Sequence, residues 1–437
     1  MKASDYKSRL QQNSKPESNP EIKQNDHLPK IPMYEQVTKQ LWDAMQGDVV
    51  WLVMQKLGID KADDRAERIS MEGQSLKVTE KVLPHLYQLF NGVKERIHFE
   101  HPIDFFIVSN PNPNACAHVV KPLDPSMPYI VEVYSAMIEI MTDQELCSVV
   151  GHEIGHLFDD NYVLNQMMYF LFGASESGYP NLPIPLRYKY FFWKQLTELF
   201  ADRYGYLATG GDIDACISAE LKLKSGLKLD KMETNIPAFI EENREALKHY
   251  ISGRGLSLYD GYTHPVSPIR IEALHLFANA KTEKELDEGM TTLINAISRL
   301  NANPIEDELV TFMAAGGMIM ANADGKITEK EYEQILGQMS NYYMFPTNIL
   351  NQITPENCSD IFNKSVDNIL KADPRNANTL FLYLVSILVS DHKLEGKELD
   401  LLFQMGKEAL HLEDRQMIDL LAEGMRRYFI PAISSIS

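Results

Sequence analysis

Two histidines and a glutamate in the segment CSVVGHEIGHLFDD, residues 147–160, have a spacing that suits metal chemistry. On a helix, His152 and His156 lie one turn apart on the same face, so both imidazoles can reach one cation. Glu153 lies about 100° around the helix and can address a water that the cation holds. A motif this short also arises by chance, so its meaning depends on what the rest of the chain supplies.

A catalytic zinc site takes three protein ligands and leaves its fourth position to water, so a third ligand is needed. A third histidine six residues after His156 is ruled out, because Tyr162 stands there. The segment TELFADRYGY, residues 197–206, offers Glu198 and, one turn later, Asp202. Glu198 could complete a His₂Glu ligand set, and Asp202 could accept the free N–H of a ligand histidine and hold its tautomer.

The elements that must carry these residues are predicted to be mostly helical. The motif helix is expected to begin at Thr142, which can form a capping box with Glu145. A second, aromatic helix is expected over residues 186–209 and would carry both carboxylates. Two apolar segments, residues 103–110 and 128–134, have the composition of strands. The expected fold class is therefore mainly α (α+β).

Composition and charge exclude several classes of function. The chain has 42 basic and 61 acidic side chains, a net charge of −19, and no basic cluster. Nucleic-acid binding needs a positive stripe and is not expected. The four cysteines are scattered without a CxxC pair, which favours a reducing compartment. No apolar stretch reaches the roughly 18 residues of a membrane span, and the N-terminus lacks the apolar core of a secretion signal. We expect a soluble, cytoplasmic protein without an integral membrane segment.

The chain is long enough for more than one domain. After about residue 300 the sequence pattern becomes helical throughout and contains no recognisable catalytic motif. We therefore expect a domain boundary near residues 299–308. The polar N-terminal segment has almost nothing to bury. We expect a disordered tail at residues 1–30, a domain that carries the motifs at 31–300 and an all-helical domain at 301–437.

Three segments follow the order and approximate spacing of the M48 family of zinc metallopeptidases, which are gluzincins: HEIGH, ELFAD and THPVSPIRI, the last at residues 263–271. The segments NACAHVV, residues 114–120, and PYIVEVYSAMIEIMTDQEL, residues 128–146, also resemble that family in its Asn-Ala segment, edge strand and pre-motif region. The resemblance implies a zincin-like domain with a small edge sheet and active-site helices. Because no membrane span is expected, the chain resembles the soluble branch of the family.

The resemblance also implies a role for individual residues. One Zn²⁺ per chain would be bound, and the implied roles are metal ligands His152, His156 and Glu198, general base Glu153, ligand-orienting Asp202, auxiliary catalytic group His264, and substrate-backbone contacts Asn114 and Ala115. The family commonly has a second proline after the His-Pro of its third motif, where this chain has Val266. That difference leaves the placement of His264 open.

The segments DGKITEKEY and DHKLEGKEL, residues 324–332 and 391–399, share a pattern and indicate a duplicated turn between helices. Residues 301–437 resemble a TerB-like helical domain through these turns, and we expect this domain to bind a protein partner. An EF-hand calcium loop is disfavoured, because Met320 would occupy its first ligand position. Weak cation binding remains possible at four carboxylates, while ordinary caps and turns are the simpler interpretation: Asp324, Glu331, Asp391 and Glu398.

Two functions are compatible with these features. The first is a soluble zinc-dependent endopeptidase that hydrolyses unfolded or flexible polypeptides, with Glu153 as general base. Residues 128–134 would add the substrate as an extra strand. The second is a latent or non-catalytic chaperone-like module, in which His264 closes the fourth position of the zinc. The intact Glu153 favours the enzyme.

Overall fold

The structure is a computed structural model that describes residues 28, 31–59, 65–118, 126–159, 162–173, 182–228, 235–251, 263–298, 304–391 and 394–428. These residues fall into two compact units, of which the first ends at Ser298 and the second begins at Pro304. Of the boundary expected near residues 299–308, residues 299–303 are outside the described ranges and 304–308 belong to the second unit. The expected tail at 1–30 also lies outside them, except for Leu28.

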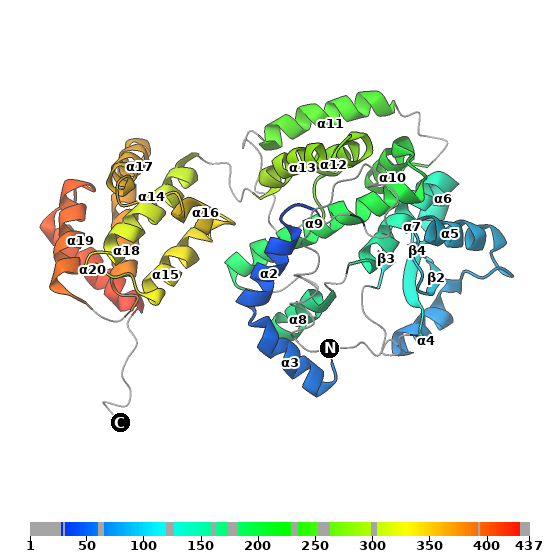
Figure 1. Ribbon diagram of the computed structural model, residues 1–437, viewed down its shortest axis with the longest axis horizontal. Helices are drawn as coiled ribbons and strands as arrows, with labels where there is room; N and C mark the ends of the chain where they lie inside the picture. The colour runs from blue at the N-terminus through cyan, green and yellow to red at the C-terminus, as the bar shows by residue number, and fades with distance from the viewer. Residues whose placement is uncertain are drawn as a thin grey trace. The chain divides into compact units, whose positions relative to one another are not determined.

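The first unit consists of helices around a small sheet, as expected for the fold class (Figure 1). Its helices are α2 Tyr34–Ala44, α3 Gly47–Leu57, α4 Arg65–Gln74, α5 Pro84–Arg96, α6 Ser135–Ile140, α7 Asp143–Leu157, α8 Tyr162–Phe172, α9 Ile184–Ala208, α10 Ile213–Ser225, α11 Ile236–Ile251, α12 Ser267–Asn279 and α13 Glu283–Ile297. Its strands are β1 Leu76–Lys77, β2 Ile103–Val108, β3 Ala115–Ala117 and β4 Tyr129–Tyr134.

The four strands form one sheet in the order β1-β2-β4-β3. Strand β4 is parallel to β2 and antiparallel to β3, so both of its edges are hydrogen-bonded. The expectation that residues 128–134 would receive a substrate strand is therefore wrong. The edge nearest the motif helix is β3, a three-residue strand that the sequence pattern did not reveal.

Helix α7 begins as predicted, because Thr142 accepts a hydrogen bond from the Glu145 N–H while the Glu145 side chain accepts one from the Thr142 N–H. The predicted apolar face points into the core at Leu146, Val149, Val150 and Ile154. Acidic side chains in the first turn also favour a helix start through the helix dipole.

Helices α7 and α9 pack antiparallel with their backbones close together. A Cβ atom at Gly151 would lie 2.2 Å from the Ala208 Cβ, and one at Gly155 would lie 2.9 Å from the Ala201 Cα. On α9, a Cβ at Gly205 would lie 2.8 Å from the Ser148 carbonyl oxygen. Only glycine fits at these contacts, and the close approach brings side chains of the two helices to one site.

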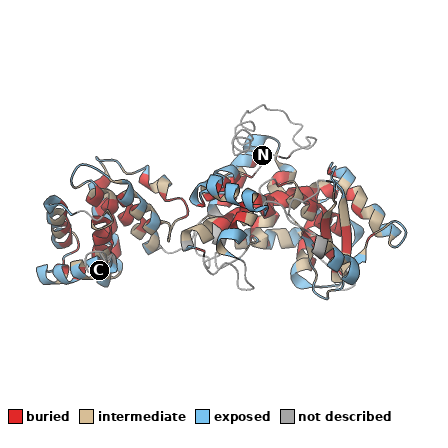
Figure 2. Ribbon diagram, turned by 90° about the horizontal axis from the view of Figure 1, so that it is seen from below, coloured by how far each residue is buried: buried red, intermediate tan, exposed pale blue. Residues whose placement is uncertain are grey.

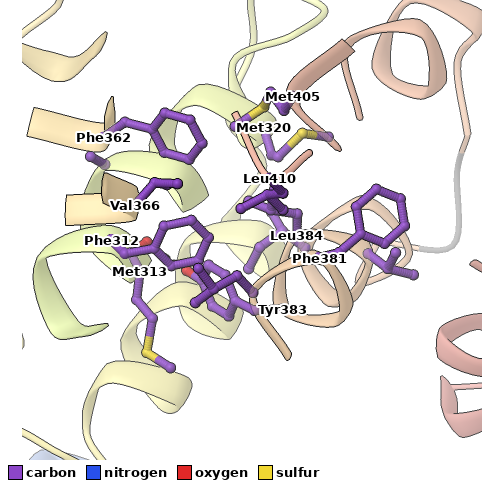
Figure 3. Close-up of a cluster of buried hydrophobic side chains, with 14 of the residues drawn as sticks. Phe312, Met313, Met320, Phe362, Val366, Phe381, Tyr383, Leu384, Met405 and Leu410 are labelled. Atoms are coloured by element: carbon purple, nitrogen blue, oxygen red, sulfur yellow. The ribbon is translucent and has the colours of Figure 1, made fainter. Parts of the chain in front are cut away.

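The second unit is helical throughout its described residues. Its helices are α14 Pro304–Ala321, α15 Glu329–Met339, α16 Pro346–Leu350, α17 Cys358–Ala372, the 3₁₀ helix η2 Pro374–Asn376, α18 Ala377–Leu388, α19 Gly396–Glu408 and α20 Asp414–Tyr428. Phe312, Phe362 and Tyr383 meet in its core, with ring centroids 5.5 Å and 5.8 Å from that of Phe312 (Figure 3). Each unit thus buries its own apolar side chains (Figure 2).

Two further observations concern the environment of the protein. All four cysteines are free thiols. Within the described ranges, no helix has both the length and the apolar character that crossing a bilayer requires.

Candidate metal centre and active site

Helix α7 places His152 and His156 on one face, as the sequence predicted. Their Nε2 atoms lie 3.2 Å apart, and the two rings meet edge to face with centroids 4.8 Å apart. Two imidazole nitrogens that face each other at this distance cannot both present a proton. They are arranged as a pair of lone-pair donors would be around a shared cation.

Helix α9 brings Glu198 to the same point. Its Oε2 lies 3.3 Å from the His152 Nε2, and its Oε1 lies 3.6 Å from the His156 Nε2. The residue is 4% exposed, and its Oε2 has no hydrogen-bond partner. A buried carboxylate oxygen without a partner is costly unless a cation fills the gap.

The three side chains form a group suited to one metal ion. One donor atom from each of His152, His156 and Glu198 lies within 4.8 Å of the other two. Across the described part of the chain, no other set of three or more His, Cys, Asp or Glu side chains meets this criterion. The His₂Glu donor set is one that zinc uses in catalytic sites.

Asp202 lies one turn beyond Glu198 and orients His152. The His152 Nδ1 donates to the Asp202 Oδ1 at 2.9 Å, so Nε2 is the ring atom available to coordinate a cation. Arg270, on α12, holds the same carboxylate through its Nε and Nη2, and its Nη1 donates to Glu220 at 2.9 Å. Ser267 also donates to Glu220, so α9, α10 and α12 are tied together here.

Arg270 and Glu220 were not identified from the sequence. Arg270 belongs to THPVSPIRI, the segment that drew attention to His264, but nothing in that segment indicates its partners. Those partners lie 68 and 50 residues earlier in the chain. An arginine between two isoleucines, Ile269 and Ile271, in a motif segment is the signal that could prompt a search for carboxylates.

Glu153 points to the sheet side of the metal group. Its Oε2 accepts a hydrogen bond from the backbone N–H of Ala117, in β3, at 2.8 Å. Burial is the main cause that raises the pKa of this carboxyl, and the charge of Glu198 adds to it. A carboxylate with a raised pKa beside a metal position is suited to accept and return a proton.

The pKa values of the titratable side chains in the group differ from their usual values. Burial opposes the charged forms of Glu198 and Asp202, but the surrounding histidines at Glu198 and Arg270 with His152 at Asp202 outweigh it and lower both pKa values. Burial also disfavours charge on His152, yet Asp202 and Glu198 raise the pKa of that imidazole to about 10. For His156, burial dominates and lowers the pKa to about 3. The shifts keep Glu198 ionised and His156 neutral, the forms in which a carboxylate and an imidazole bind a cation.

His264 lies at the rim of the group. Its Nε2 is 3.2 Å from the Glu198 Oε2, its Nδ1 is 2.9 Å from the Thr263 hydroxyl, and 56% of its side chain is exposed. Burial of the ring is the main cause that lowers its pKa. His264 is near the metal position but is not one of the three grouped donors.

The group opens into a cavity of about 350 Å³. Asn114 and Ala115, expected near a substrate backbone, line it from the β3 side. Val149 from α7, Ile217 from α10 and Leu274 from α12 make much of the remaining wall apolar. A mostly apolar cavity with a few convergent polar groups is the usual form of a substrate site.

Three of the four carboxylates expected to bind a cation in the second unit have structural roles. Glu331 and Glu398 close capping boxes at the starts of α15 and α19, and Asp324 accepts the Lys326 N–H. Burial, and then the charges of Glu331, Asp391 and Asp324, raise the pKa of Glu398, so the four groups are neighbours. The caps agree with the simpler interpretation, and weak cation binding stays a prediction.

Comparison with known proteins agrees with this geometry. Residues 84–277 match the family described as Peptidase family M48, and this segment contains the whole metal group. The chain is similar to the plastoglobule-localized metallopeptidase 48, chloroplastic, of Arabidopsis thaliana, with 27% identity over 222 residues. The alignment covers 49% of this chain and 62% of that protein, so the chain spans less than two thirds of its relative's length. No solved structure matches the chain.

Proposed function

We propose that the chain, through the M48 family domain supported at residues 84–277, is a zinc-dependent metalloendopeptidase that cleaves unfolded or flexible polypeptides. The observation that carries the proposal is the convergence of two helices on one point. Helix α7 supplies His152, Glu153 and His156, while α9 supplies Glu198. Each of the four side chains lines the cavity.

The donors present fit zinc. Two imidazole nitrogens and one carboxylate leave a coordination position open, and no fourth donor from the described residues joins them. The unpartnered oxygen of Glu198 is the atom that a cation would satisfy. Zinc held there would lower the pKa of a water molecule toward about 7 and polarise the scissile carbonyl.

Glu153 would take the proton of the attacking water and return it to the leaving amine. Its Oε2 is held by the Ala117 N–H, so the carboxylate keeps one orientation while its other oxygen handles the proton. Asp202 would hold His152 in the tautomer that a ligand needs, and Arg270 would keep Asp202 in place. His264 is near enough to donate to the oxyanion.

The outer edge of β3 would bind the substrate as an added strand. Asn114 and His118 make backbone hydrogen bonds to β4, so the alternation of an antiparallel pair turns the backbone groups of Ala115 and Ala117 outward. Glu153 occupies the Ala117 N–H, which leaves Ala115 for the substrate. Binding by backbone requires an extended segment, and this favours unfolded chains over compact ones.

Residues 301–437 would form a separate TerB-like domain that binds a protein partner, and the domain at 31–300 would be the peptidase. The free cysteines are compatible with a reducing compartment such as the cytoplasm, which we propose as the location. The Arabidopsis relative, by its name, is a chloroplast protein.

The test compares the wild type with Glu153→Gln, using dye-labelled casein as an unfolded substrate and counting bound zinc in both samples. We expect cleavage by the wild type, loss of at least about 100-fold in rate for the variant, and equal zinc. Equal zinc with no cleavage by either protein would instead favour the latent or chaperone-like module. His264→Ala would then test whether His264 closes the metal position.

A further inference from the structure

A lysine lines the cavity without a carboxylate to neutralise it. Lys194 lies on α9 one turn before Glu198, on the same face of the helix, and is half-buried. Its Nζ is 5.8 Å from the ring centroid of Trp193. Within the described ranges it forms no ion pair.

The other basic group of the cavity is fully engaged. Arg270 donates to both oxygens of Asp202 and to Glu220. Lysines on the neighbouring helix α10 also have partners, since Lys222 pairs with Glu145 and Lys224 with Glu220. Among the described residues of the cavity wall, Lys194 is thus the cation that remains able to bind an incoming anion.

Lys194 and the apolar Val149 lie on opposite sides of the metal group. Val149 precedes His152 by one turn on α7, and Lys194 precedes Glu198 by one turn on α9. Because the two helices are antiparallel, one turn back on α7 and one turn back on α9 lead in opposite directions. Val149 and Lys194 therefore lie at opposite ends of the metal group along the helix pair. A chain lying across the metal group would therefore meet the apolar Val149 on one side and an ammonium group on the other.

We propose that Lys194 binds a substrate carboxylate and makes the site selective for substrates that carry a carboxylate close to the cleaved bond. The carboxylate belongs either to an Asp or Glu side chain on one side of the cleaved bond or to the C-terminus of the substrate, two sources with the same chemistry. The inference rests on the proposed peptidase function. A charge-assisted hydrogen bond inside a cavity is worth about 10-fold to 100-fold in affinity.

The test uses full-length, zinc-bound protein and short quenched-fluorescent peptides that differ only by Glu or Gln at one position on either side of the cleaved bond. A second pair differs only by a free or amidated C-terminus. We expect the wild type to cleave one acidic member at least about 10-fold faster, measured as kcat/KM. The side-chain and C-terminal sources are distinguished by which pair shows the preference.

Lys194→Met should bring that ratio to about one, Lys194→Arg should restore most of it, and Lys194→Glu should reverse it for a Lys-containing peptide. Lys284→Met removes the same charge from an exposed position on α13 and should keep the wild-type ratio. A wild type without preference at any position, or an undiminished preference in Lys194→Met, would overturn the proposal.

Binding of the same peptides to the Glu153→Gln protein, followed by fluorescence anisotropy, separates this inference from the proposed activity. Failure of the peptidase function would leave every peptide uncleaved. The Kd ratio of the Glu and Gln peptides would still be at least about 10-fold and would still depend on Lys194. Equal Kd values would contradict the role of Lys194 whether or not the protein is an enzyme.

Discussion

Arg270 binds Asp202 with two guanidinium nitrogens, Nε at 3.0 Å from Oδ2 and Nη2 at 2.6 Å from Oδ1. The same carboxylate accepts the Nδ1 proton of His152 at 2.9 Å. A residue of α12 thereby sets the orientation of a metal-facing imidazole on α7 through a side chain of α9. This bidentate pair is geometrically specific in a way that a lysine could not reproduce.

Arg270→Met should destabilise the protein by about 3–5 kcal/mol, because it leaves Asp202 and Glu220 buried without their cation. Urea unfolding of the metal-free full chain would measure the change. Arg244→Met is the matched control, since it breaks the more exposed pair with Glu272 and should cost only about 0–1 kcal/mol. Equal losses in the two variants would contradict the structural role of Arg270.

Glu198→Gln should strip zinc from the protein. The variant removes the anionic ligand, so the affinity should fall by more than the roughly 10- to 100-fold that loss of an outer hydrogen-bond partner costs. Metal analysis after dialysis against a weak chelator would compare it with Glu139→Gln, an exposed residue that pairs with Lys228. Full zinc retention in Glu198→Gln would remove Glu198 from the ligand set.

The buried pair of Glu145 and Lys222 should make stability depend on pH. The Lys222 Nζ donates to the Glu145 Oε2 at 2.7 Å, linking α7 to α10. Burial opposes the charge on Glu145, but hydrogen bonds from Lys222, Ser218 and Thr142 outweigh it and lower the pKa below the ordinary 4.5. The unfolded chain therefore binds a proton first, and the stabilisation is complete above pH 4.5 and lost as the pH falls further.

The difference in unfolding free energy between the wild type and Glu145→Gln isolates this contribution. We expect the difference to be constant above about pH 5 and to shrink below about pH 4.5, as the carboxyl of the wild type becomes protonated. Denaturant unfolding at several pH values checks it. A difference that grew toward acid would show that the pKa of Glu145 is raised in the folded protein.

Gly151→Ala should separate the two helices that carry the metal group. Its new methyl would meet the Ala208 Cβ at 2.2 Å, so α7 or α9 must shift, and overpacking of this kind costs about 1–3 kcal/mol. Gly92→Ala on α5 is the control, because its methyl meets no atom within 4 Å and alanine favours helix by about 0.5–1 kcal/mol. A neutral Gly151→Ala would show that the helices can move apart freely.

Helical spacing explains why much of the site was predictable. The turn between His152 and His156 and the turn between Glu198 and Asp202 are local properties of single helices, and the capping box of Thr142 is local as well. The second helix was expected at 186–209 and runs from Ile184 to Ala208. The helical period thus predicts which of these side chains share a face, whatever their partners in other helices are.

The contributions of β3 and α12 depend on tertiary packing and could not be obtained in this way. Strand β3 has the sequence Ala-Cys-Ala, which contains no β-branched or aromatic residue, so no strand signal exists. Its edge position follows from the sheet order, which places β4 in the interior. The partners of Arg270 were equally hidden, because a buried ion pair between distant segments leaves no periodic pattern.

Two residues of strand β3, Ala115 and Ala117, present backbone groups along the same edge. The N–H of Ala117 holds the Glu153 carboxylate, and the backbone of Ala115, two residues earlier, faces outward along the same edge. Any shift of this short strand moves both groups together. Under the proposed function, a change in how this edge binds a polypeptide would also displace the proton acceptor Glu153, so new specificity would have to come from the side-chain walls of the cavity.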